Sequence, residues 1–79
     1  MKTKLEKLIL LEFRNSPPFL SFRYKKKWWR KEGPNCIVRE LDNKVERESI
    51  NNNSVVAFNH QSFPLHLRKH AVGIFVVKI

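Results

Sequence analysis

Interruptions in the chain restrict every element of this protein to a short segment. Pro17-Pro18, Gly33-Pro34 and Pro64 each interrupt regular backbone structure, and Asn51-Asn52-Asn53-Ser54 adds a turn. The chain has only 79 residues, and a chain of that length buries about 60–65% of the surface of its unfolded state. We therefore expect one small domain over residues 1–79, built from short elements around a thin core.

The first segment predicts an amphipathic helix over residues 3–14. Thr3, with Glu6 three residues later, has the pattern of a capping box. Apolar residues between Leu5 and Phe13 then recur at helical spacing, and the proline pair that follows ends the segment.

Residues 19–29 predict a continuous strand in which apolar and basic side chains alternate. In that strand Tyr24 and Trp28 share the apolar, inward face, while Trp29 falls on the basic, outward face. A helix that begins after Ser16 aligns the same apolar residues and remains an alternative.

Residues 36–50 are compatible with two structures. A helix would stack the apolar residues of this segment on one face. A hairpin would turn at Asp42-Asn43 and place Arg39 opposite Glu46. We favour the hairpin, because the β-branched residues cluster in its two arms.

The remaining segments predict two further strands, over Val55–Phe58 and Ile74–Ile79. Residues 63–70, interrupted by a proline, form one helical turn or an edge strand. Together the elements predict an α+β fold, with one N-terminal amphipathic helix packed on a small, mostly antiparallel sheet. Whether some parts become ordered only on a partner stays open.

The charge of the chain indicates an acidic partner. Sixteen Lys and Arg face seven Asp and Glu, which gives a formal net charge of +9. Self-repulsion of that size destabilises a small protein, and a polyanion relieves it. Nucleic acid, an anionic membrane surface and an acidic protein are the candidate partners.

The positive charge is concentrated in residues 23–31, R-Y-K-K-K-W-W-R-K, which we call the basic-aromatic segment. Cations neutralise phosphates, and flat rings stack on unpaired bases, so this composition predicts contact with RNA. In this prediction the lysines bind phosphates, the arginines bind phosphates or bases, and the aromatic rings stack on bases. The predicted nucleic-acid-binding residues are Arg23, Tyr24, Lys25, Lys26, Lys27, Trp29, Arg30, Lys31, Arg68 and Lys69.

Three histidines and Cys36 are the other candidates for chemistry. His66 and His70 have helical zinc-site spacing, but no paired Cys or His-Glu motif accompanies them, so we expect no metal and no cofactor. The two glycines of the chain form no phosphate-binding loop. A small ribonuclease that uses a histidine with Arg68 and Lys69 is the catalytic alternative.

One stretch, residues 55–63, V-V-A-F-N-H-Q-S-F, resembles the first motif of the glycerolipid acyltransferases. In that family an apolar strand leads into Asn-His-x-x-x-x-Asp, whose Asp orients the His as general base. Asn59 and His60 match this motif, but Leu65 stands at the position of the Asp. Because a His without an orienting carboxylate loses much of its basicity, the resemblance does not predict an active enzyme.

The sequence therefore favours a non-catalytic RNA-binding protein. A structural component of a ribonucleoprotein, such as a cytoplasmic or organellar ribosome, is the concrete version, with rRNA and neighbouring proteins as partners. A structural or protein-interaction subunit of a larger, membrane-associated complex is the alternative, with Leu5–Phe13 and Ala71–Ile79 as docking elements. No apolar run is long enough to span a bilayer, although contact with a membrane surface is compatible with the charge. The single cysteine mildly favours an intracellular location.

Overall fold

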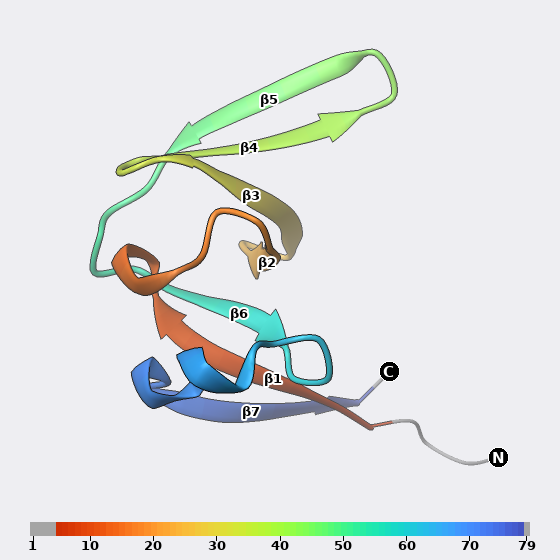
Figure 1. The fold of residues 1–79 in the computed structure, drawn as a ribbon. Helices are drawn as coiled ribbons and strands as arrows, with labels where there is room; N and C mark the ends of the chain where they lie inside the picture. Colours follow the sequence, from red (N-terminus) through yellow and green to blue (C-terminus); the bar gives the residue numbers. More distant parts are fainter. Residues whose placement is uncertain (1–4, 79) are drawn as a thin grey trace, which may run out of the picture.

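A computed structural model describes residues 5–78, which form one antiparallel sheet of seven strands (Figure 1). The strand order is β5-β4-β3-β2-β6-β1-β7. Two short 3-10 helices, η1 and η2, connect strands. The elements are β1 (Leu5–Glu12), η1 (Phe13–Asn15), β2 (Ser21–Tyr24), β3 (Lys27–Gly33), β4 (Cys36–Leu41), β5 (Lys44–Ser49), β6 (Val55–Asn59), η2 (Leu65–His70) and β7 (Gly73–Lys78).

The predicted α+β fold with an N-terminal helix is wrong, because residues 5–12 form strand β1. β1 pairs with β6 on one side and with β7 on the other, so it lies inside the sheet. Leu8 and Ile9 point to opposite faces, and both are buried. A strand that is buried on both faces is apolar at successive positions, and such a run imitates a helical stripe. Thr3, half of the predicted capping box, lies outside the described residues.

The predicted continuous strand over residues 19–29 is also wrong. The chain reverses at Lys25 and Lys26, and β2 and β3 form an antiparallel hairpin on either side of this turn. Both turn residues have left-handed backbone angles, with φ of 52° and 66°. Positive φ at both central residues is the geometry of a type I′ turn, whose twist matches that of the flanking strands.

The hairpin predicted within residues 36–50 is confirmed. β4 and β5 are joined at Asp42-Asn43, and Arg39 pairs with Glu46 as expected. The strands expected over 55–58 and 74–79 correspond to β6 and β7, with Ile79 outside the described residues. Residues 65–70 form the helical turn η2 rather than an edge strand.

The sheet curls around a core to which most strands contribute alternate residues (Figure 1). Four phenylalanines pack in a row within this core, in the order Phe13, Phe22, Phe58 and Phe63. The ring centroids of successive pairs are 5.9, 5.7 and 5.2 Å apart. The core residues are Ile9, Leu11, Phe13, Phe22, Trp29, Ile37, Ile50, Val56, Phe58 and Phe63. We call the side of the sheet that contains these residues the core face, and the opposite side the outer face.

Candidate nucleic-acid interface

The turn at Lys25 and Lys26 determines which tryptophan is accessible. Phe22 pairs with Trp29 across the hairpin, and both side chains lie on the core face. Arg23 pairs with Trp28 one position along, which places Trp28 on the outer face. The exposed fraction is 47% for Trp28 and 3% for Trp29. The prediction that Trp29 faces outward and Trp28 inward is therefore wrong.

Trp29 is held in the core by polar as well as apolar contacts. Its indole Nε1 donates a hydrogen bond to the main-chain oxygen of Tyr24 at 3.0 Å. The guanidinium carbon of Arg39 lies 5.6 Å from the ring centroid, within the range of a cation–π contact. Because this ring is enclosed, it offers no face to a base, and Trp29 is not retained as a stacking residue.

Arg23 and Trp28 form a basic-aromatic pair on the outer face. Arg23 also pairs with Ala57 of β6. The Arg23 side chain is exposed and makes no ion pair with any acid among residues 5–78. One flat ring and one uncompensated cation are thus adjacent on an accessible surface.

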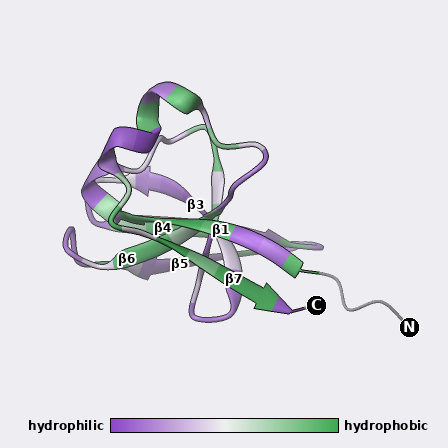
Figure 2. Ribbon diagram, turned by 90° about the horizontal axis from the view of Figure 1, so that it is seen from below, coloured by the Kyte–Doolittle hydropathy of each residue, from purple (hydrophilic) through white to green (hydrophobic). Residues whose placement is uncertain are grey.

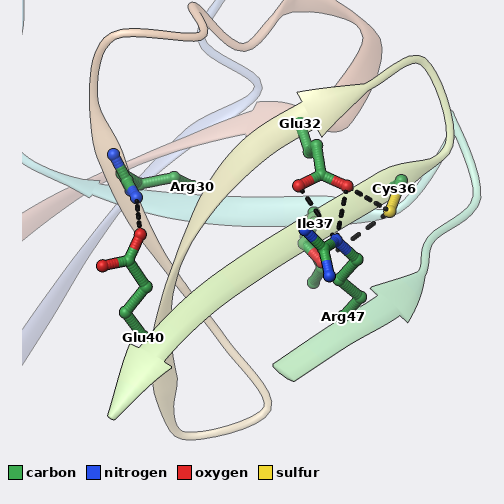
Figure 3. Close-up of polar contacts among 6 residues, drawn as sticks. All are labelled: Arg30, Glu32, Cys36, Ile37, Glu40 and Arg47. Atoms are coloured by element: carbon green, nitrogen blue, oxygen red, sulfur yellow. Dashed lines mark hydrogen bonds and ion pairs between the residues drawn. The ribbon is translucent and has the colours of Figure 1, made fainter. Parts of the chain in front are cut away.

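Other charges on the outer face are neutralised within the sheet (Figure 3). The Arg30 guanidinium lies 2.8 Å from a carboxylate oxygen of Glu40, and the Arg47 Nε lies 2.9 Å from one of Glu32. Cys36 donates to the same Glu32 at 3.5 Å. Partial burial, and then the Glu32 carboxylate, raise the pKa of the Cys36 thiol above its ordinary value. Arg30 is therefore less available to a phosphate than Arg23.

Three lysines of the basic-aromatic segment lie at the end of the β2–β3 hairpin. Lys25 and Lys27 are within 3.9 Å and 4.0 Å of carboxylate oxygens of Glu48 and Glu46, respectively. Ion pairs of that length between exposed groups stabilise little, so a phosphate can replace the carboxylate. Lys26 is exposed and has no acidic partner among the described residues. This end of the hairpin is the most accessible concentration of positive charge on the segment.

The other predicted contact residues do not gather at the same place. The Lys31 Nζ points to the core face, where it donates to the main-chain oxygens of Phe13 and Ser16 at 3.4 and 3.3 Å. Arg68 on η2 donates to the main-chain oxygen of His60 at 3.0 Å and lies 3.4 Å from its ring nitrogen Nε2. Lys69, also on η2, is exposed.

No protein-family model, curated protein or solved structure matches this chain.

The histidines do not assemble a metal site in this part of the chain. Within residues 5–78 there is no group of three His, Cys, Asp or Glu side chains that could hold a metal ion. His60 faces a guanidinium rather than a carboxylate, and Leu65, at the position of the acyltransferase Asp, is exposed. No helix within this range is long and apolar enough to cross a membrane.

Sequence reasoning missed Trp28 as the accessible ring, although one signal for it was present. Trp28 and Trp29 are neighbours, so in any strand their side chains point to opposite faces. Where only one face of the sheet is covered, one of the two is therefore accessible and the other is buried. The position of the turn decides which one, and the Lys-Lys turn carries none of the Gly or Asn residues that normally mark it.

Proposed function

We propose that this protein binds single-stranded RNA through the β2–β3 hairpin, as a non-catalytic component of a ribonucleoprotein. The observation that carries the proposal is the exposed Trp28 ring beside the uncompensated Arg23, next to the end of the hairpin that carries Lys25, Lys26 and Lys27. A base stacks on the Trp28 ring, while Arg23 and the lysines at the turn bind the flanking phosphates. Stacking on an aromatic ring contributes about 1–3 kcal/mol per base.

Salt dependence tests the electrostatic part of the proposal. Arg23, Lys25, Lys26 and Lys27 provide four phosphate contacts, and each contact to a single strand contributes about −0.7 to the slope of log K against log salt. We expect a slope of about −3 for a fluorescein-labelled 12-nucleotide single-stranded RNA, measured by anisotropy. A DNA strand of the same sequence and a duplex RNA serve as comparisons. A slope near zero, or tighter binding to the duplex, contradicts the proposal.

Substitution of Trp28 tests the stacking part. Trp28→Ala removes the ring and lowers the affinity for the single strand by about 5- to 150-fold, which corresponds to 1–3 kcal/mol. Trp28→Phe retains a flat ring and keeps most of the affinity. Val45→Ala removes a similarly exposed apolar side chain from β5 and serves as the matched control. If Trp28→Ala and Val45→Ala bind equally well, Trp28 is not a stacking residue.

A protein-interaction role is the second candidate, and one observation favours it. Strand β7 exposes three consecutive apolar side chains at an edge of the sheet: Ile74, Phe75 and Val76. This surface lies on a different strand from the β2–β3 hairpin, so both functions are compatible with one chain.

A further inference from the structure

The two edges of the sheet differ in character. β5, at one edge, has four charged side chains among its six residues, and charge is a common feature of edge strands that avoid pairing. β7, at the other edge, carries one charged residue, Lys78, at its end. Figure 2 shows β7 in the hydrophobic colour along most of its length. Ile74, Phe75 and Val76 are 61%, 54% and 50% exposed, so β7 is the edge with the features of a pairing site.

The hydrogen bonds of β1 establish which way its backbone groups point. The His60 N–H donates to the main-chain oxygen of Lys7 at 3.1 Å, on the side of β1 that faces β6. Backbone groups of successive residues point to opposite sides of a strand. The odd-numbered residues of β1 therefore bond toward β6, and the even-numbered ones toward β7.

The register of β7 then identifies its free groups. Leu8 of β1 pairs with Phe75, so the odd-numbered residues of β7 bond to β1. The N–H and C=O groups of Ile74, Val76 and Lys78 consequently point away from the sheet. No strand among the described residues pairs with this side of β7. These outward groups form a ladder that an added strand can continue.

Charge around the edge indicates the chemistry of the added strand. Lys7 of β1 pairs with Val76 of β7. The side chains of Lys7 and Lys78 are both exposed, and neither has an acidic partner in residues 5–78. Glu6 is the acid closest to this edge in the register, and it accepts a hydrogen bond from Asn59 at 3.5 Å. A carboxylate on an added strand, next to Val76, comes within reach of both lysines.

A cavity at the same end of β7 supports this direction of approach. It has a volume of about 660 Å³, and its lining includes two charged side chains of β1, Glu6 and Lys7, with Leu5, His60 and Val76. The cation and the apolar surface of this lining adjoin β7, to which Val76 belongs.

We propose that the open edge of β7 binds an extended segment of an acidic partner protein, which adds an eighth strand to the sheet. The segment alternates apolar residues, which cover Phe75 on the outer face, with carboxylates that pair with Lys7 and Lys78. Charge disfavours a second copy of this chain as the occupant, because each copy brings a formal net charge of +9. The proposal does not depend on RNA binding by the β2–β3 hairpin.

A designed peptide tests the proposal directly. The probe is a blocked, fluorescein-labelled octapeptide of alternating valine and glutamate, and anisotropy measures its binding to the full chain. Two controls share its length: one with lysine in place of glutamate, and one with alternate backbone nitrogens methylated. We expect the glutamate peptide to bind at least tenfold more tightly than either control. Equal binding of the glutamate and methylated peptides overturns the proposal, because strand addition needs the backbone groups.

Substitutions at the two edges locate the site. Val76→Pro removes an outward N–H without breaking a bond to β1, and we expect loss of peptide binding. Val45 of β5 is the matched position at the other edge. The Ile50 N–H donates to the Asn35 carbonyl, so the backbone groups of even-numbered residues point toward β4 and those of odd-numbered residues, such as Val45, point outward. Val45→Pro is expected to retain full binding. Val76→Glu, which leaves the backbone unchanged but places a like charge beside the glutamates of the peptide, provides a second variant and is also expected to lose binding.

Two further measurements identify the occupant and separate this proposal from RNA binding. Amide shifts in a heteronuclear NMR spectrum are expected to change at Ile74 and Val76. Changes confined to the β2–β3 hairpin overturn the proposal. Sedimentation velocity tests whether the free chain self-associates. If it does, and if Val76→Lys abolishes the association, the occupant of the β7 edge is a second copy of the chain and not an acidic partner. Trp28→Ala is expected to leave peptide binding unchanged, so failure of the RNA proposal leaves this one testable.

Discussion

We expect the two adjacent tryptophans, Trp28 and Trp29, to contribute unequally to stability, because only Trp29 is buried. Trp29→Ala leaves a cavity in the core and removes the donor to the Tyr24 carbonyl. A buried Trp→Ala change costs about 3–5 kcal/mol, and a lost hydrogen bond adds about 1 kcal/mol. A chain of this length has a free energy of unfolding of about 4–12 kcal/mol. Trp29→Ala therefore removes a third or more of the stability, and at the lower end of this range all of it.

Trp28→Ala provides the comparison within the same hairpin. Trp28 is half-exposed and contributes through its cross-strand pair with Arg23, which is worth about 0.2–1 kcal/mol. Urea denaturation followed by far-UV circular dichroism measures both variants. We expect a small shift of the midpoint for Trp28→Ala, and a loss of several kcal/mol or of the cooperative transition for Trp29→Ala. Trp29→Phe, which fills part of the space, is expected to lie between them.

Either of two outcomes refutes the reasoning. If both alanine variants lose the same stability, the two rings are equally buried, which contradicts a hairpin register that places them on opposite faces. If Trp28→Ala is the more destabilising variant, the pairing of β2 with β3 is shifted by one residue, because such a shift exchanges the two faces. Refolding of each variant from urea with recovery of the initial spectrum is the control for aggregation.

Three further predictions follow from the local geometry. Lys26→Gly relieves the strain of a non-glycine residue in the left-handed backbone conformation, so it raises the free energy of unfolding by about 1 kcal/mol. The same substitution removes one phosphate contact and reduces the magnitude of the salt slope for RNA by about 0.7. A decrease in stability on urea denaturation contradicts this turn geometry. Lys31→Met removes the donors to the Phe13 and Ser16 carbonyls and lowers the free energy of unfolding by about 1–2 kcal/mol; an unchanged urea midpoint contradicts these bonds. Glu32→Gln lowers the raised pKa of Cys36 and accelerates its alkylation by iodoacetamide at pH 8.5, because the thiolate is the nucleophile; an equal or slower rate contradicts the contact with Glu32.

Segments with an ordinary signal for strands were predictable from the sequence. The hairpin at Asp42-Asn43 has a turn residue that tolerates positive φ, and Asp42 adopts a φ of 50°. The strands that correspond to β6 and β7 are rich in β-branched residues, which favour strands wherever they lie in a sheet. In these segments local preference and tertiary structure agree.

The N-terminal segment was not predictable by the same rules, because its periodicity depends on its neighbours. Ile9, Leu11 and Phe13 alternate as in a strand with one face in the core. Leu8, from the other set of positions, is buried as well because β1 lies between β6 and β7. With both sets apolar, alternation disappears and helical spacing takes its place. Only the position of the segment inside the sheet, which arises from long-range pairing, separates the two structures.

The basic-aromatic segment shows how a misfit in a pattern carries information about function. As a continuous strand it contains two misfits: Lys26 on the apolar face and Trp29 on the basic face. A two-residue turn at Lys25 and Lys26 accounts for the first, and it moves Trp29 into the core opposite Phe22. Trp28 then remains as the large ring that the correct register places outside, next to Arg23. Residues that break a local rule without a structural reason are expected at functional sites. With the turn at Lys25 and Lys26, the exposed ring of Trp28 is such a residue, and it is therefore the one to test for base stacking.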